Sequence, residues 1–147
     1  MYVDRISRQA WLPLGAALIF AISAVGSYSS IAAAADIKVT LAGDQEVPPV
    51  KSGGTGTGMI TIGADKSVSG SVTTTGILGT AAHIHEGAIA TNGPVIIPLT
   101  KTGDTYAVSA GAKLTDAQFA SFQAGKLYVN VHTTANPGGE MRAQLKP

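Results

Sequence analysis

The sequence predicts an all-β fold, namely an antiparallel Greek-key-like β-sandwich or barrel of about seven or eight strands with one short helix near residues 115–124. Two observations carry this prediction. Short runs of alternating apolar and polar residues recur along the chain, and Gly, Pro, Asn and Asp separate them. In addition, only one stretch carries a clear helix-start signal. Together these features favour a domain built from hairpins.

The strand predictions follow from alternation. Between Asp36 and Leu41, apolar side chains alternate with Lys38 and Thr40, which is typical of a half-buried strand. Two adjacent prolines in 44–50 remove ladder donors, so that segment is an edge or a loop. A two-residue turn at 102–103 would place Lys101 opposite Asp104. The expected strands are 36–41, 59–62, 68–75, the run containing His83 and His85, 95–99, 106–108, 127–132 and 140–145.

The helix prediction depends on residues 115–118. Thr115 followed by Gln118 is a capping-box pattern, in which each side chain bonds the other residue's backbone N–H. Phe119 and Phe122 then supply an apolar side. We expect the helix to end near Gly125.

Residues 1–35 are predicted to be a secretory signal peptide. Arg5 and Arg8 precede an apolar run over residues 11–25, and small residues lead to Ala35. The run is short for a membrane-spanning helix, which needs about 20 apolar residues, so we expect no stable membrane span after cleavage near Ala35. The protein is expected to be secreted or periplasmic, with residues 36–147 as a single domain.

Charge and cysteine content narrow the function classes. Without the expected signal, the chain's ten basic and nine acidic residues reduce to eight of each, which argues against nucleic acid as a partner. The chain contains no cysteine, so thiolate nucleophiles and thiolate metal ligands are excluded. The expected partners are a metal ion and an extracellular protein.

The chain has three histidines, and their spacing suggests a shared site. His83 and His85 are two residues apart on a predicted strand and therefore project from the same face. His132 lies on the face opposite Leu127, Val129 and Val131 of another strand. If the two strands pair, three imidazoles meet in a site suited to copper, or to zinc as the second choice. A hydrogen-bond network and three unrelated surface histidines are the alternatives.

Three further residues are candidates for supporting this site. If 134–138 forms a five-residue loop, His132 sits near Glu140, and Asn130 sits near Arg142. Glu140 could then orient His132, as carboxylates do for metal-bound imidazole. An exposed Glu140–Arg142 ion pair is the alternative, and residues alone do not separate the two.

Five stretches of the chain form a distinctive set, in one order over nearly all of the predicted mature chain. They are Leu41 to Pro49, Ala82-His83-Ile84-His85-Glu86-Gly87, Asn92-Gly93-Pro94-Val95, Leu127 to Thr133 and Asn136 to Arg142. Together they resemble the CHRD domain, which was first described in chordin and is widespread in secreted bacterial proteins. The resemblance implies a β-sandwich or barrel and brings no established activity.

A second resemblance is to Cu/Zn superoxide dismutase, through the segment His83-Ile84-His85-Glu86. It implies an immunoglobulin-like sandwich and copper ligation by His83 and His85, with His132 as the later histidine. That family's two-metal site needs additional histidines, including one that bridges copper and zinc, and this chain has none left to supply them. A dinuclear dismutase is excluded by this count.

Three functions remain open at this stage. The first is mononuclear copper or zinc binding through the three histidines. The second is a non-enzymatic extracellular interaction module in which the histidines serve structure. The third is a copper-dependent oxidoreductase resembling superoxide dismutase. We expect binding rather than catalysis and assign no catalytic residue.

Overall fold

The computed structural model describes residues 34–147, so almost all of the predicted signal peptide lies outside the described part. Within that part the all-β prediction is confirmed. One short α-helix accompanies eight strands and a 3-10 turn. The elements are β1 Ala35–Leu41, η1 Gly43–Gln45, β2 Thr55–Ile62, β3 Val68–Thr75, β4 Gly79–Glu86, β5 Val95–Thr102, β6 Thr105–Val108, α1 Asp116–Gln123, β7 Leu127–Thr133 and β8 Met141–Leu145.

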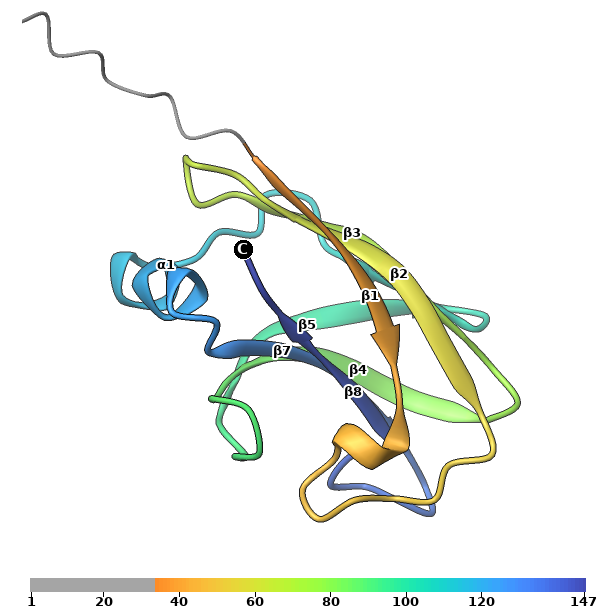
Figure 1. The fold of residues 1–147 in the computed structure, drawn as a ribbon. Helices are drawn as coiled ribbons and strands as arrows, with labels where there is room; N and C mark the ends of the chain where they lie inside the picture. Colours follow the sequence, from red (N-terminus) through yellow and green to blue (C-terminus); the bar gives the residue numbers. More distant parts are fainter. Residues whose placement is uncertain (1–33) are drawn as a thin grey trace, which may run out of the picture. The chain divides into compact units, whose positions relative to one another are not determined.

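The eight strands form one antiparallel sheet in the order β1-β2-β3-β6-β5-β4-β7-β8. Its two edge strands approach each other, because Ala42 and Arg142 exchange backbone hydrogen bonds of 3.1 and 3.2 Å. The sheet is therefore a nearly closed barrel, in which β1 passes close to β8 (Figure 1). Closure of this kind shields backbone groups that an open edge would expose.

The barrel interior is filled by alternate residues of every strand. Leu127, Val129 and Val131 of β7 are fully buried, as their alternation predicts. Met141 and Leu145 of β8 pack beside them. These strands thus present their other side chains on the outer face of the barrel.

The outer face of β7 and β8 is also covered, which the sequence pattern did not reveal. Tyr128, Asn130 and Arg142 point outward from the barrel core, yet they are only 2, 1 and 2% exposed. The segment that carries η1 and the loop 87–94 contact these residues and shield them from water. A second, largely polar interior therefore lies outside the barrel.

The β5–β6 hairpin turns one residue later than predicted. Its two turn residues are Gly103 and Asp104, so Lys101 pairs with Tyr106 and Thr102 with Thr105. The predicted Lys101–Asp104 pair was therefore wrong. Gly103 has φ of +61°, a left-handed conformation that glycine adopts without strain, which favours placing it inside the turn.

Helix α1 starts as predicted. The Thr115 side chain accepts from the Gln118 N–H, and the Gln118 side chain accepts from the Thr115 N–H, so the capping box is complete. Phe122 is buried against the barrel. The Ser121 hydroxyl donates to Glu86 at 2.6 Å and ties the helix to the end of β4.

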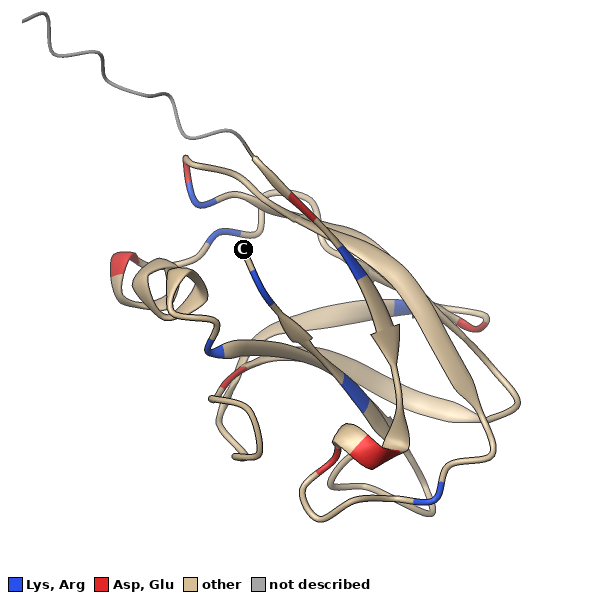
Figure 2. Cartoon of the chain, in the orientation of Figure 1, with Lys and Arg blue, Asp and Glu red and all other residues tan. Residues whose placement is uncertain are grey.

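Charged residues of both signs are interspersed over the domain (Figure 2). Among residues 34–147 there is no helix both long and apolar enough to cross a membrane.

Candidate metal centre

The pairing of β4 with β7 places all three histidines on one face. In this register Ala81 lies opposite His132, His83 opposite Asn130, and His85 opposite Tyr128. Because residues two apart in a strand project from the same side, the histidines share the outer face with Asn130 and Tyr128. The predicted meeting of His83, His85 and His132 is what the structure shows.

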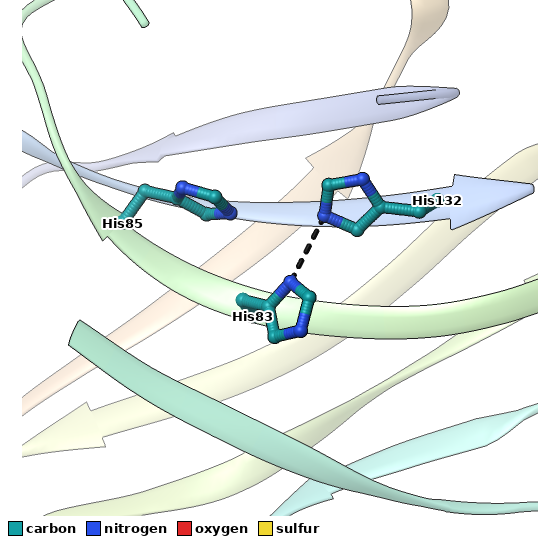
Figure 3. A group of neighbouring side chains, drawn as sticks. All are labelled: His83, His85 and His132. Atoms are coloured by element: carbon teal, nitrogen blue, oxygen red, sulfur yellow. Dashed lines mark hydrogen bonds between the residues drawn. The ribbon is translucent and has the colours of Figure 1, made fainter. Parts of the chain in front are cut away.

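The three imidazole rings face one another (Figure 3). One nitrogen from each ring can be chosen so that all three lie within 4.8 Å of one another. The ring centroids are 4.8 Å apart for His83 and His132, 5.6 Å for His83 and His85, and 5.8 Å for His85 and His132. These separations gather three candidate ligands into one cluster.

Backbone carbonyls fix two of the rings. The Nδ1 atom of His85 lies 3.0 Å from the Gly93 oxygen, and that of His132 lies 3.0 Å from the Pro137 oxygen. A carbonyl oxygen can only accept, so each Nδ1 carries the proton and donates it. In a neutral ring the Nε2 atom then holds a lone pair, which is the form that binds a metal ion.

The remaining contact joins two histidines. His83 Nδ1 and His132 Nε2 are 3.0 Å apart. Because His132 already donates from Nδ1, its Nε2 accepts here, and His83 Nδ1 is the donor. This hydrogen bond must open before His132 Nε2 can bind a cation.

His85 Nε2 has no such partner. His85 is 7% exposed, and its Nε2 is buried without a hydrogen bond. A buried polar atom without a partner costs free energy, so its presence in a folded domain calls for an explanation. A metal cation is one partner that can satisfy the lone pair of a neutral imidazole.

The surroundings favour neutral imidazoles. Burial lowers the pKa of His83, and the nearby His132 and His85 lower it further. Burial also lowers the pKa of His85, more than the hydrogen bond to Gly93 raises it. The same balance, with Pro137 as the hydrogen-bond partner, lowers the pKa of His132. Metal ions bind the neutral form, so these shifts prepare the rings for ligation near neutral pH.

Glu140 does not orient His132, and this prediction is corrected. The regular pairing of β7 and β8 ends at Val131–Met141, so Glu140 lies just outside the paired strand. Its carboxylate accepts from the Thr133 hydroxyl at 2.9 Å and from the Asn136 amide at 2.5 Å. The Pro137 carbonyl takes the place expected for the carboxylate. The alternative of an exposed Glu140–Arg142 pair is also wrong, because both residues are buried and Arg142 pairs elsewhere.

Asn130 and Arg142 lie opposite each other, as predicted, and both contact Glu46. The Asn130 amide donates to both Glu46 oxygens, at 2.9 and 3.1 Å. The Arg142 Nε donates to Glu46 at 3.0 Å, and its other nitrogens donate to Thr91 and Asn92 of the loop 87–94. Burial raises the pKa of Glu46, although its bonds to Arg142 and Asn130 oppose the rise.

Sequence reasoning missed Glu46, Tyr128, Gly93 and Pro137. Tyr128 could have been found, because it alternates with Asn130 and His132 on the same face of the predicted strand. Glu46 stands within the CHRD-like stretch from Leu41 to Pro49, which was its only signal. Gly93 and Pro137 act through backbone oxygens, and a side-chain pattern carries no trace of such a role.

A nearly closed antiparallel barrel with three gathered imidazoles defines a small β-domain with a candidate metal centre. In a comparison with known families, the sequence model of the CHRD domain matches residues 37–145. The chain therefore belongs to the CHRD domain family. Comparisons with curated proteins and with solved structures gave no match.

Proposed function

We propose that this protein binds one metal ion, copper in the first place and zinc in the second, through His83, His85 and His132. One observation carries the proposal. The Nε2 atom of His85 is buried without a partner, and it lies within a cluster of three imidazoles whose nitrogens are mutually within 4.8 Å. Such a cluster of neutral imidazoles is a typical ligand set for copper or zinc.

The geometry is compatible with a small adjustment on binding. Nitrogens held about 2.0–2.1 Å from a tetrahedral ion are about 3.3 Å from one another. His83 Nδ1 carries the proton of its 3.0 Å hydrogen bond to His132 Nε2, so His83 binds the ion only when this proton moves to its Nε2 or the ring turns to present Nε2. One nitrogen from each ring lies within 4.8 Å of the other two, so rotation of the His83 ring, which no backbone carbonyl holds, would bring the set together.

The donor chemistry favours copper and zinc over other cations. Imidazole suits both metals, whereas magnesium and calcium take oxygen ligands. The chain has no cysteine, so no thiolate is available to bind zinc or an iron–sulfur cluster. Copper stands above zinc in the general affinity order for divalent ions, which supports it as the first choice. Secretion or export to the periplasm, suggested by residues 1–35, is part of the same proposal.

Titration of the metal-free protein with Cu(II) tests the proposal. We expect one equivalent to bind, with a loss of affinity of at least about 10- to 100-fold in His85→Ala and His132→Ala. Thr57→Ala, an exposed change on the outer face of β2, is the control and should bind like wild type. Stoichiometric binding that survives both histidine changes would contradict the proposal.

The second candidate is an extracellular interaction module with structural histidines. The hydrogen bonds from His132 to Pro137 and between His83 and His132 favour it, because they hold the loop after β7 without any metal. Thermal unfolding separates the two functions. A ligand that binds only the folded state raises the melting temperature in proportion to its affinity and concentration. An unchanged melting temperature with added Cu(II) or Zn(II) would favour the interaction module.

A further inference from the structure

Asn130 lies on the covered outer face, beside the histidine cluster in the strand register. It is 1% exposed, lies directly opposite His83 in the β4–β7 ladder, and precedes His132 by two residues on the same face. Its Nδ2 atom donates to both oxygens of Glu46. Its Oδ1 atom is buried and has no hydrogen-bond partner.

The orientation of this amide is determined by its neighbour. Reversing the group would set Oδ1 against the Glu46 carboxylate and leave two acceptors facing each other. The Glu46 carboxylate is itself held by Arg142 Nε at 3.0 Å, with both side chains 3% exposed. Glu46 and Arg142 therefore hold the Asn130 oxygen on the side of the amide turned away from Glu46.

Two unsatisfied acceptors consequently lie on the same face of the paired strands β4 and β7. In the described part of the chain, three buried side-chain polar atoms lack partners, and two of them are Asn130 Oδ1 and His85 Nε2. Given the His85 tautomer, both are lone pairs without a donor. A cation satisfies two lone pairs at once, which a second acceptor cannot do.

We propose that Asn130 Oδ1 is the fourth protein donor of the three-histidine site and makes it selective for Cu(II) over Cu(I). This inference rests on the proposed metal-binding function and extends it to the oxidation state of the ion. Three imidazoles and one amide oxygen form an N3O set. Oxygen donors suit harder, divalent ions, whereas Cu(I) is soft and gains little from them. Removing the oxygen should therefore weaken Cu(II) binding and leave Cu(I) binding by the three imidazoles intact.

Competition titrations of the full protein against chelators specific for each oxidation state provide the test. In Asn130→Ala we expect Cu(II) affinity to fall by about 10- to 100-fold, within the range seen when groups that support metal ligands are removed. Cu(I) affinity should change by less than about threefold. A selective tenfold loss corresponds to a rise of about 59 mV in the one-electron reduction potential of the copper site.

The control variant is Thr57→Ala. Its exposed side chain on the outer face of β2 is not part of the histidine site, so both copper affinities should stay as in wild type. A merely structural role of Asn130 would lower both affinities in parallel, because the same histidines bind both ions, and that result would overturn the inference. Unchanged Cu(II) affinity in Asn130→Ala would also overturn it.

A spectroscopic measurement covers the case in which Asn130→Ala fails to fold. Wild-type protein labelled with ¹³C at asparagine side-chain carbonyls is loaded with Cu(II) and studied by pulsed electron paramagnetic resonance. A resolved ¹³C coupling that persists in Asn136→Ala supports a bound amide oxygen, and its absence from wild type rejects one. If wild type binds neither copper ion, the proposed function itself fails; if it binds both without selectivity from Asn130, only this inference fails.

Discussion

His85 stacks on Tyr128, with their rings 9° from parallel and their centroids 4.9 Å apart. The guanidinium carbon of Arg142 lies 4.3 Å from the Tyr128 centroid. Tyr128 thus links the histidine cluster to the buried Glu46–Arg142 pair. Its hydroxyl also accepts from the Gly93 N–H at 3.1 Å, and the carbonyl of that same Gly93 accepts from His85.

Removing only the Tyr128 hydroxyl should destabilise the domain. Tyr128→Phe keeps the stack but leaves the Gly93 N–H without its acceptor, at a cost of about 1–3 kcal/mol in the free energy of unfolding. Urea denaturation measures the change. Tyr106→Phe is the matched control, because the buried Tyr106 hydroxyl makes no hydrogen bond of normal geometry, although the Thr74 side chain lies nearby, and its removal should cost much less than that of the Tyr128 hydroxyl. Equal losses in the two variants would contradict the role assigned to the Tyr128–Gly93 contact.

Breaking the buried ion pair should be far more costly. Arg142→Met leaves the Glu46 charge buried with Asn130 as its only side-chain donor, and removal of one partner of such a pair costs about 3–5 kcal/mol. Denaturant melts of Arg142→Met and of Arg142→Met/Glu46→Leu provide the measurement, and the double variant should recover much of the loss. Lys113→Met, at the exposed Lys113–Asp65 contact of 3.4 Å, should change stability little. An Arg142→Met protein as stable as wild type would show that Glu46 is not charged in the fold.

A side chain at position 93 should damage the metal centre. A Cβ atom added to Gly93 would overlap the carbonyl oxygen of Glu86, which is backbone and cannot rotate away. The loop 87–94 must then shift, and the Gly93 carbonyl moves off His85. We expect Gly93→Ala to lower both the melting temperature and the copper affinity. Gly138→Ala is the control, because its Cβ would meet nothing within 4 Å; equal effects from the two changes would argue against this prediction.

The metal-free protein should lose stability as pH falls below about 6.5, the ordinary histidine pKa. The folded state lowers the pKa values of His83, His85 and His132, so below this pH the unfolded state binds more protons. The stability that the neutral histidines contribute is fully present above the unfolded-state pKa. It is lost as the pH falls from there toward the lower folded-state pKa values. Glu46 acts in the opposite sense, because its folded-state pKa is raised.

Urea midpoints between pH 7.5 and 5 for wild type and His85→Gln isolate the histidine contribution from that of Glu46. We expect a smaller decline with falling pH in the variant. Parallel curves would show that His85 does not carry the pH dependence.

Much of the strand architecture was accessible from local pattern. Alternation in residues 127–132 predicted which side chains fill the barrel, and the Thr115–Gln118 pair predicted the helix start. The gathering of the three histidines followed from two-residue periodicity plus one assumption, that their strands pair. The Lys101–Asp104 register failed because a one-residue shift of a turn leaves the local composition unchanged but moves every cross-strand partner.

The sequence by itself determined the all-β class, the inward face of each strand and the identity of the candidate ligands, because these depend on side-chain alternation and residue type. Only the tertiary structure decided that β4 pairs with β7 and that loops bury the outer face. It also decided that Gly93 and Pro137, rather than Glu140, orient the rings. Those features depend on contacts between segments far apart in the chain and on backbone oxygens, which every residue possesses and no residue type distinguishes.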